Sequence, residues 1–286
     1  MNIIDKYSND VTPTWCPGCG DFSVLRSVKA AASHLNIENH NLSIVSGIGC
    51  SGRISGYINS YGFHSIHGRA LPIAQGIKLA NPSLTVVAMG GDGDGFAIGT
   101  NHTVHAMRRN INITYIVMNN QIYGLTKGHT SPLSEKGFVT KSSPFGCNDS
   151  PLKPGLLALA SGASFIAQGF SAYQTQLVDL IIKAINHRGF SFINIFSPCV
   201  TFNKTNTYEW FRKNLANIDE DQDHDIRSYR KAMDKYIETD GLFTGLLYEN
   251  TESSSDGDLN NRRGKSIANQ DLNILKDFDN LMKNFI

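Results

Sequence analysis

The stretch from Gly90 to Ile122 contains the residue types best suited to binding a phosphorylated ligand. It begins with Gly-Gly-Asp-Gly-Asp-Gly and ends with Asn-Asn-Gln-Ile. Glycines allow tight turns and a close approach of the backbone to a phosphate group. The carboxylate of Asp92 and the amide oxygen of Asn120 are hard oxygen ligands, which Mg²⁺ takes together with substrate or cofactor phosphates. The pattern predicts a magnesium–phosphate site; the alternative is a glycine-rich active-site turn that binds no metal.

Three other motifs rich in glycine or acidic residues do not fit this stretch. An EF-hand calcium loop beginning at Asp92 would require Glu at its last ligand position, where Thr103 stands. A dinucleotide fingerprint would require a third glycine where Phe96 stands, and the Gly-Lys-Ser or Gly-Lys-Thr of a P-loop is absent from this stretch. Residues 47–53 do have fingerprint spacing, but the acidic residue that would bind a ribose hydroxyl does not follow them. The nucleotide interpretations therefore fail.

Four of the five cysteines occupy positions from which they could ligate one metal centre. Cys16 and Cys19 form a Cys-x-x-Cys pair, whereas Cys50 and Cys199 each follow a predicted strand. In a parallel sheet these positions gather at the edge that carries the predicted magnesium site, and four thiolates can hold Zn²⁺ or an iron–sulfur cluster. The alternatives are one pair beside two unrelated core cysteines, or a redox dithiol, which is less favoured because no strand precedes the pair. Cys147, in a long loop, is left out of the set.

A strand–helix–strand unit is expected to position Asp92 and Asn120. Residues 84–89 and 113–118 are short apolar runs rich in β-branched residues, which is typical of buried strands. Residues 96–109 between them have the length and mixed polarity of a helix. Such a unit is right-handed, so both strands end at the same edge of a parallel sheet, where ligands bind in open α/β folds.

The remaining pattern also alternates between strands and helices and predicts an α/β fold with a mostly parallel central sheet. Further strands are expected over 42–46, 164–167 and 190–196, and further helices over 21–34, 72–80, 156–161 and 172–186. Asp21 is expected to cap the first helix. Residues 123–150 are too long for an inert connection, which indicates a functional lid or binding loop.

The chain of 286 residues is 41% hydrophobic and has a formal net charge of +1. This length suits one large domain over 1–202 with a charged C-terminal appendage over 203–286. The net charge gives no support for binding nucleic acid or an anionic membrane. We find neither a signal sequence nor an apolar run long enough to span a membrane. We therefore expect a cytoplasmic protein whose odd number of cysteines serves metal or redox chemistry rather than disulfides.

Charge is distributed unevenly along the chain. Residues 39–91 contain no Asp or Glu but several cationic side chains, which suits an anionic ligand; chance depletion in a buried region is the alternative. Beyond residue 202 there is an acidic cluster over 219–225. Residues 251–266 are poor in apolar residues, which is typical of a flexible segment, and 272–285 have apolar residues at helical spacing, which predicts a terminal helix.

Gly-Asp-Gly followed by Asn-Asn resembles the thiamine-diphosphate motif. With the segments around it, the chain resembles the β subunit of 2-oxoacid:ferredoxin oxidoreductases over roughly residues 10–205. The segments that carry the resemblance are Trp-Cys-Pro-Gly-Cys-Gly (15–20), Ile-Gly-Cys-Ser-Gly-Arg (48–53), His-Gly-Arg-Ala-Leu-Pro (67–72), Lys-Leu-Ala-Asn-Pro (78–82), Gly-Asp-Gly-Asp-Gly (91–95) and Tyr-Gly-Leu-Thr-Lys-Gly (123–128). No motif covers the tail from Asn203 onward.

This resemblance implies a three-layer thiamine-diphosphate-binding fold and the oxidative decarboxylation of a 2-oxoacid with coenzyme A to acyl-CoA and CO₂, with ferredoxin as the electron acceptor. It implies a [4Fe-4S] cluster held by Cys16, Cys19, Cys50 and Cys199, and Mg²⁺ held by Asp92, Asn120 and the carbonyl of Ile122. The implied thiamine contacts are Ile48, Gly49, Ser51, His67, Gly68, Gly93, Asp94, Gly124 and Leu125. Arg53 stands where several members have a lysine facing the substrate carboxylate; Lys127 is a second candidate for that role, and His67 is the third catalytic candidate.

In this family the carboxylate that contacts the aminopyrimidine ring comes from a separate α subunit, so the resemblance implies an α–β hetero-oligomer. Two alternatives are a thiamine-dependent non-redox decarboxylase or carboligase, which the cysteine set disfavours, and a non-catalytic scaffold subunit, which intact Asp92 and Asn120 disfavour. Among substrates we favour 2-oxoglutarate, because additional cationic groups could meet its second carboxylate, with pyruvate next.

Overall fold

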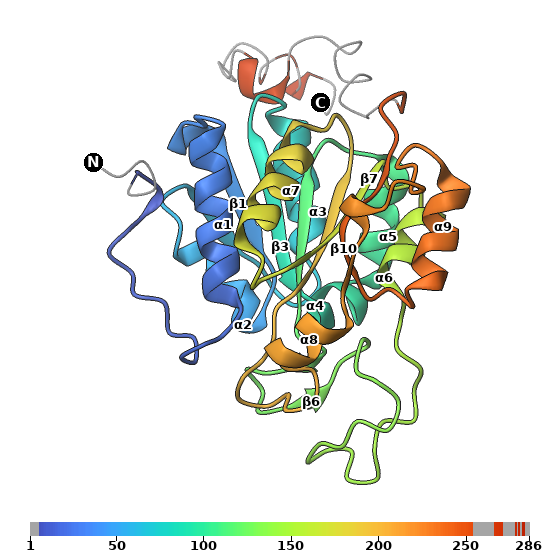
Figure 1. Ribbon diagram of the computed structural model, residues 1–286. Helices are drawn as coiled ribbons and strands as arrows, with labels where there is room; N and C mark the ends of the chain where they lie inside the picture. Colours follow the sequence, from blue (N-terminus) through green and yellow to red (C-terminus); the bar gives the residue numbers. More distant parts are fainter. Residues whose placement is uncertain (1–5, 254–265, 271–277, 279, 281, 284–286) are drawn as a thin grey trace.

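The computed structural model describes residues 6–253, 266–270, 278, 280, 282 and 283. These residues form an eight-stranded sheet covered by helices on both faces (Figure 1). None of the helices in this part of the chain is long and apolar enough to cross a bilayer. The helix expected over 272–285, apart from isolated positions, and most of the segment expected to be flexible over 251–266 lie outside the described residues.

The strands of the sheet are β1 (Leu42–Ser46), β2 (Tyr61–His64), β3 (Thr85–Gly91), β4 (Thr114–Asn119), β7 (Phe165–Phe170), β8 (Ser191–Phe196), β9 (Ala216–Asn217) and β10 (Phe243–Glu249). Their order across the sheet is β2-β1-β3-β4-β8-β7-β10-β9. Neighbours from β2 to β7 are parallel, whereas β10 runs antiparallel to β7 and β9 pairs parallel with β10. The sheet is therefore mostly parallel, as expected.

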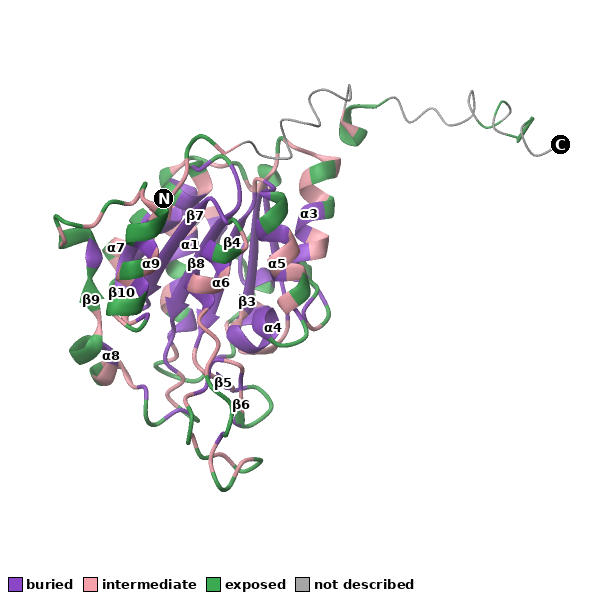
Figure 2. Ribbon diagram, turned by 90° about the vertical axis from the view of Figure 1, so that its right-hand side faces the viewer, coloured by how far each residue is buried: buried purple, intermediate pink, exposed green. Residues whose placement is uncertain are grey.

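Continuous apolar runs form the centre of the sheet because helices cover both of its faces. Every residue of β4 and β8 is buried (Figure 2), and parallel strands buried on both sides need no alternation of polar residues. Successive side chains still point to opposite faces. In β1, Ile44 packs into the core beneath one helical layer and Val45 into the core beneath the other.

The two helical layers use different helices. One layer consists of α1 (Asp21–His34) and α7 (Gln174–Asn186), and the other of α3 (Ala70–Ala80), α5 (Thr100–Arg109), α6 (Pro154–Ala160) and α9 (Tyr229–Glu238) (Figure 1). In sequence order, α8 (Tyr208–Asn214), α9 and β10 follow residue 202, so the last part of the chain contributes both a covering helix and a strand of the central sheet. β10 was not predicted, although Phe-Thr-Gly-Leu-Leu-Tyr (243–248) is a mostly apolar run.

The helix expected over 96–109 begins four residues later than predicted: it is α5, which starts at Thr100, and Asp92–Phe96 form a separate short helix, α4. Gly99 lies between the two helices, where a Cβ atom would overlap the Asp94 carbonyl oxygen and lie 3.1 Å from Gly68 Cα. The loop that contains Gly68 can approach this closely only because residue 99 has no side chain. Thr103 Oγ1 donates to the Gly95 carbonyl at 2.8 Å and ties the two helices together.

Two other expectations are corrected. Residues 61–64 form β2, which was not predicted; it is only four residues long, and all four are exposed. Asp21 does not cap α1: Gly20 occupies the N-cap position, and Asp21 is the buried first residue of the helix. Its carboxylate instead accepts a hydrogen bond from Ser197 Oγ at 2.7 Å. The other expected elements are confirmed within a few residues at each end.

A buried histidine at the opposite edge of the sheet should make folding stability depend on pH. His187 Nε2 lies 2.7 Å from Ser164 Oγ, and Nδ1 lies 3.4 Å from Glu249 Oε1. Burial lowers the pKa of His187, and the attraction of Glu249 only partly opposes this. The unfolded chain, with an ordinary imidazole pKa of about 6.5, then takes up the proton first as the pH falls. The free energy of unfolding should therefore decrease as the pH drops below about 6.5.

The variant His187→Gln removes this titration and should flatten the dependence of the urea midpoint on pH between about pH 7.5 and about pH 5.5. His40→Gln is the matched control, because His40 is exposed. This variant should show the same pH dependence of the urea midpoint as the unmodified protein. Equal slopes for the unmodified protein and His187→Gln would contradict the assignment.

Candidate active site

Asp92 and Asn120 lie at the ends of two neighbouring parallel strands. β3 ends at Gly91 and β4 at Asn119, and Gly91 pairs with Met118 in the ladder between them. Both side chains line one cavity of about 270 Å³, which we call the diphosphate cavity. The strand–helix–strand unit thus brings them to the same edge of the sheet, as its handedness predicted.

The environment of the Asp92 carboxylate suits a bound cation. The residue is 1% exposed, and Ser131 Oγ donates a hydrogen bond to Oδ2. Burial raises the pKa of Asp92 to about 7, and the hydrogen bond from Ser131 opposes part of this rise. In the described part of the chain no cationic side chain forms an ion pair with Asp92. A buried carboxylate is unfavourable without a positive partner, so the site fits a divalent metal ion that neutralises it.

The turn after β4 holds Asn120 in place through its own amide side chains. Asn119 Oδ1 accepts from the Gln121 amide at 3.3 Å, and Asn120 Oδ1 accepts from the Ile122 amide at 3.0 Å. Gln121 adopts a left-handed conformation with φ of 58°, which reverses the chain at this point. Asn203 Nδ2 donates to the Asn120 carbonyl at 3.1 Å and holds the turn from the other side.

Several glycines line the diphosphate cavity, so the main chain itself forms that part of the wall. A Cβ atom at Gly91 would lie 2.9 Å from Ser51 Oγ, and one at Gly93 would overlap the Tyr123 ring. Tyr123 donates its hydroxyl hydrogen to the Gly93 carbonyl at 2.9 Å and so covers this turn. Gly49 has φ of 82°, which favours glycine. Such a cradle fits a diphosphate group held close to main-chain N–H groups.

Asp94 binds other parts of the protein rather than standing free in the cavity. Its Oδ1 accepts hydrogen bonds from the amides of Gly68 at 2.8 Å and Ile48 at 3.2 Å and lies 2.9 Å from His67 Nδ1. It thereby connects α4 to the loops that follow β1 and β2. Of the expected cofactor contacts, His67 and Gly68 do not line the diphosphate cavity, whereas the others do.

The four cysteines of the predicted set meet around a second cavity of about 160 Å³, which we call the cysteine cavity. Cys16 and Cys19 come from the loop before α1, Cys50 from the short helix α2 (Gly49–Gly52) and Cys199 from the segment after β8. A Cβ atom at Gly124 would lie 3.6 Å from Cys199 Sγ and 3.8 Å from Cys50 Sγ. Four thiols around one cavity fit a cluster with four cysteine ligands.

The surroundings of Cys19 and Cys50 raise the pKa of their thiols. Burial raises the pKa of the Cys50 thiol to about 11, and the nearby Asp21 carboxylate adds to this. Burial raises the pKa of Cys19 as well. Metal binding at such thiols must release protons. Within the described residues, no three Cys, His, Asp or Glu side chains converge on a position for one metal ion. Cys147 is buried in the long loop, 3.9 Å from the Asp149 carbonyl, and does not line the cysteine cavity.

The diphosphate cavity and the cysteine cavity share part of their walls. The residues that line both are Cys50, Asn120, Gly124 and Leu125. A ligand in one cavity is therefore separated from a ligand in the other only by single side chains and a stretch of backbone. An electron donor and an electron acceptor placed in them would be close neighbours.

The two cationic candidates lie in different places. Arg53 lines the cysteine cavity and an adjoining open groove of about 420 Å³ that also contains His64. Its guanidinium donates to Thr14 Oγ1. Lys127 is exposed, has a left-handed backbone with φ of 71°, and lines neither the diphosphate cavity nor the cysteine cavity. Arg53 is thus the better-placed of the two for binding a carboxylate beside the site.

Three residues of the site were missed in the sequence. Ser131 binds the Asp92 carboxylate, Asn203 binds the turn that carries Asn120, and Tyr123 covers Gly93. Tyr123 begins one of the motifs, so it could have been found there. Ser131 and Asn203 carry no local signal, because their partners lie 39 and 83 residues away in the chain.

Comparison with known proteins agrees with this geometry. The family described as the C-terminal TPP-binding domain of thiamine pyrophosphate enzymes matches residues 47–195, and the C-terminal part of the pyruvate ferredoxin oxidoreductase β subunit matches residues 199–261. The 2-oxoacid:ferredoxin oxidoreductase 2 subunit beta of Aeropyrum pernix is 43% identical over 219 residues, covering 77% of this chain and 71% of that protein. The 2-oxoglutarate synthase subunit KorB of Archaeoglobus fulgidus is 40% identical over 245 residues, covering 82% and 91%.

A solved structure shows the same likeness in three dimensions. The 2-oxoglutarate:ferredoxin oxidoreductase from Magnetococcus marinus, with 2-oxoglutarate, coenzyme A and succinyl-CoA bound, matches with a TM-score of 0.87 and 41% identity, covering 91% of this chain and 89% of that chain. The chain belongs to the family of 2-oxoacid:ferredoxin oxidoreductase β subunits. This confirms the resemblance, the α/β fold class and the class of enzyme, an oxidoreductase whose electron acceptor is ferredoxin.

In this 2-oxoacid:ferredoxin oxidoreductase β subunit, the two matched segments contribute different parts of the site. The thiamine pyrophosphate domain contains all the residues that line the diphosphate cavity, including Asp92 and Asn120. Cys50 also falls in that domain and Cys199 begins the second matched segment, whereas Cys16 and Cys19 precede both. The cysteine cavity is thus built from three separate parts of the chain.

Proposed function

We propose that this β subunit, paired with an α subunit, catalyses the coenzyme A-dependent oxidative decarboxylation of 2-oxoglutarate, with electrons leaving through a [4Fe-4S] cluster to ferredoxin. The observation that carries the proposal is the shared wall between the diphosphate and cysteine cavities, to which Cys50 and Asn120 contribute. Enzymes that only decarboxylate need no electron acceptor beside the cofactor. A cysteine centre in that position serves a reaction in which electrons must leave.

In this proposal Asp92, Asn120 and the Ile122 carbonyl hold Mg²⁺, which binds the diphosphate of thiamine diphosphate. Asp92 supplies the negative charge, and the Asn119–Ile122 turn fixes the amide oxygen. When bound, thiamine diphosphate supplies a nucleophilic carbon that allows cleavage of the bond beside a keto group. Residues 91–94 bring the backbone close to the diphosphate, and Asp94 keeps the surrounding loops and His67 in position.

Cys16, Cys19, Cys50 and Cys199 are the proposed cluster ligands. Their support is that all four line one cavity although they come from three separate segments of the chain. Cys147, which lies elsewhere, has no part in it. Ferredoxin is the proposed acceptor because the curated relatives carry it in their names.

The α subunit is proposed because the curated relatives are β subunits of enzymes with several subunits. Residues 47–195 account for one thiamine-binding domain of this chain. The carboxylate that activates the aminopyrimidine ring is assigned to the partner subunit, so the β subunit alone should be inactive.

The choice of 2-oxoglutarate rests on the cationic groups beside the shared wall. Arg53 faces the cysteine cavity and the open groove that also contains His64, and a planar guanidinium can bind a carboxylate through two hydrogen bonds. The relative from Magnetococcus marinus binds 2-oxoglutarate and coenzyme A. The test is reduction of ferredoxin or a viologen by the α–β complex with a panel of 2-oxoacids and coenzyme A. A preference for pyruvate would overturn the choice of substrate, and no reduction with any 2-oxoacid would overturn the reaction.

Substitution of Arg53 should lower activity in a graded way. Arg53→Ala removes a charge-assisted hydrogen bond, so its kcat/KM should be at least about tenfold lower than that of the unmodified complex. Arg53→Lys keeps the charge, so its kcat/KM should lie between those of the unmodified complex and of Arg53→Ala. If Arg53 binds the distal carboxylate, 2-oxoglutarate is affected far more than pyruvate; if it binds the shared carboxylate, both are affected alike. Lys127→Ala tests the second candidate and should leave kcat/KM unchanged if Arg53 alone has this role. An unchanged kcat/KM of Arg53→Ala for every 2-oxoacid would rule out this role.

A further inference from the structure

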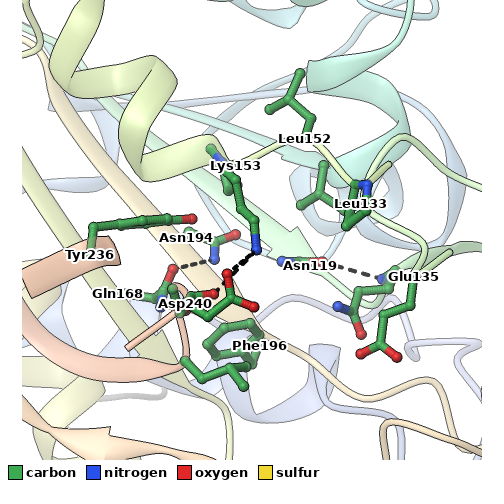
Figure 3. Close-up of a pocket in the computed structure, with 15 residues that line it drawn as sticks. Asn119, Leu133, Glu135, Leu152, Lys153, Gln168, Asn194, Phe196, Tyr236 and Asp240 are labelled. Carbon is green, nitrogen blue, oxygen red and sulfur yellow. Dashed lines mark hydrogen bonds and ion pairs between the residues drawn. The ribbon is translucent and has the colours of Figure 1, made fainter. Parts of the chain in front are cut away.

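A third cavity lies behind the turn that carries Asn120. Residues of the turn alternate between two cavities: Asn120 and Ile122 line the diphosphate cavity, whereas Asn119 and Gln121 line this third one, of about 150 Å³ (Figure 3). Its floor is formed by the ends of β4, β7 and β8, and its rim by the start of α6 and the segment after α9. We call it the rear cavity.

One wall of the rear cavity carries a buried acceptor without a donor. Gln168 Nε2 donates to the carbonyls of Gly241 at 2.6 Å and Phe243 at 2.9 Å, so this atom must be the nitrogen. Gln168 Oε1 must then accept, and Asn194 Nδ2 donates to it at 2.8 Å. These contacts fix the orientation of both amides. Asn194 Oδ1 is left with no donor among the described residues, although Asn194 is only 2% exposed.

A second buried oxygen atom belongs to a residue that lines the rear cavity. Gln121 Oε1 is buried and has no hydrogen-bond donor in the part of the chain that the structure describes. The main chain of Gln121 is fully engaged, because its amide binds Asn119 Oδ1 at 3.3 Å and its carbonyl accepts from Ser134 Oγ at 2.6 Å. Buried acceptors without donors are unfavourable. The rear cavity therefore needs an occupant that donates hydrogen bonds.

Charged groups of both signs stand around the same cavity. At its rim Lys153 Nζ lies 2.6 Å from Asp240 Oδ1, and both side chains are partly exposed (Figure 3). Glu135, also in the lining, accepts from Asn206 Nδ2 at 2.9 Å. An occupant that carries an ammonium group would satisfy the two acceptors and lie near Glu135 and Asp240, and a carboxylate on the same molecule would share Lys153 with Asp240.

We propose that the rear cavity binds a small α-amino acid. Its ammonium group donates to Asn194 Oδ1 and Gln121 Oε1, and its carboxylate accepts from Lys153. The volume of about 150 Å³ is that of cavities that hold a ligand of roughly six non-hydrogen atoms, which suits alanine or serine and excludes the aromatic amino acids. Such an occupant contacts Gln121, the residue that follows Asn120. The proposal does not depend on the reaction proposed above, since an amino acid has no keto group to be decarboxylated.

The test measures binding of alanine and serine to the α–β complex by isothermal titration calorimetry, with three variants of this chain. Lys153→Met removes the cationic contact and should weaken binding about tenfold. Leu152→Phe adds volume at the wall and should abolish binding. Lys213→Met changes an exposed lysine of α8 and should bind as the unmodified complex does.

The Lys153 variant should fold, because its partner Asp240 is largely exposed and surface ion pairs contribute little to stability. Propionate and pyruvate, which lack the ammonium group, and potassium chloride are the comparison ligands and should not bind in the rear cavity. Three results would each overturn the proposal: no saturable binding of either amino acid, equally tight binding of propionate, or unchanged affinity in Lys153→Met. The first would mean that only water satisfies Asn194 and Gln121.

Discussion

Replacing Asp92 by alanine should abolish thiamine diphosphate binding while leaving the cysteine centre intact. Asp92 is a buried carboxylate of the diphosphate cavity, and Ser131 and the backbone of Asn120 and Gly93 bind it. Without it, Mg²⁺ at this site would lose the one carboxylate that we propose as its ligand. Removing one partner of a buried charge pair costs about 3–5 kcal/mol, so the dissociation constant in the presence of Mg²⁺ should rise at least about a hundredfold. Calorimetric titration of the α–β complex with thiamine diphosphate measures this directly.

The matched control is Asp149→Ala, which changes an exposed carboxylate of the long loop and should keep normal affinity. Iron content should be the same in both variants. Stability provides a second readout. The folded pKa of Asp92, about 7, is above its unfolded value of about 3.9. Without Mg²⁺, the unfolded chain binds fewer protons between these values, so the protein should lose stability as the pH rises from about 4 to about 7.

Asp92→Asn removes this titration, and above about pH 7 the metal-free variant should be more stable than the unmodified protein. Normal thiamine diphosphate affinity in Asp92→Ala would show that the metal is held elsewhere. A metal-free Asp92→Asn protein that is less stable than the unmodified one would show that the carboxylate has a structural partner.

Cys50→Ser should remove most of the iron from the protein, whereas Cys147→Ser should leave it unchanged. Cys50 lines both the cysteine cavity and the diphosphate cavity, and a serine hydroxyl is a poor replacement for a thiolate as an iron ligand. Purified without oxygen, the unmodified chain should contain about four irons and show a broad visible absorption band that dithionite bleaches. In Cys50→Ser both the iron content and the band should fall by more than about half.

Cys147 is the natural control because it is a free cysteine, more buried than Cys50, that lies in the long loop, away from the other four. A colourless protein with one tightly bound zinc would contradict the cluster assignment, as would equal iron loss in the two variants. Assembly of the cluster should also release protons, because burial keeps the thiol of Cys50 protonated in the metal-free protein.

Much of the fold and of the site could be predicted from the sequence because its signals are local. The central strands β1, β3, β4 and β8 are continuous apolar runs, and such runs need both faces of a sheet covered wherever they lie. The right-handed crossover then places Asp92 and Asn120 at one edge without further information. The four cysteines could be selected over Cys147 for the same reason, since Cys50 and Cys199 each follow a strand of that sheet.

Other elements were not predicted from their local sequence. β2 is short and exposed along its whole length, and β10 joins the sheet antiparallel to β7 from the C-terminal segment, which we expected to be an appendage. The close approach of Gly68 to Gly99, between α4 and α5, brings together two loops that are distant in the sequence. A helical pattern records which residues prefer a helix, and it contains nothing about a neighbouring loop that requires room.

The composition of the site was determined by the sequence, and its energetics by the tertiary structure. Residue types and spacing were sufficient to select Asp92, Asn120 and the cysteines as candidate ligands. Only the folded chain decided that Ser131 would bind the Asp92 carboxylate and that Asp94 would bind His67 and Gly68. It also decided that Asn194 would keep an acceptor without a donor among the described residues. The reason is physical: a carboxylate or amide is defined by its own atoms, whereas its pKa and its hydrogen bonds depend on burial and on partners that are brought to it from distant parts of the chain.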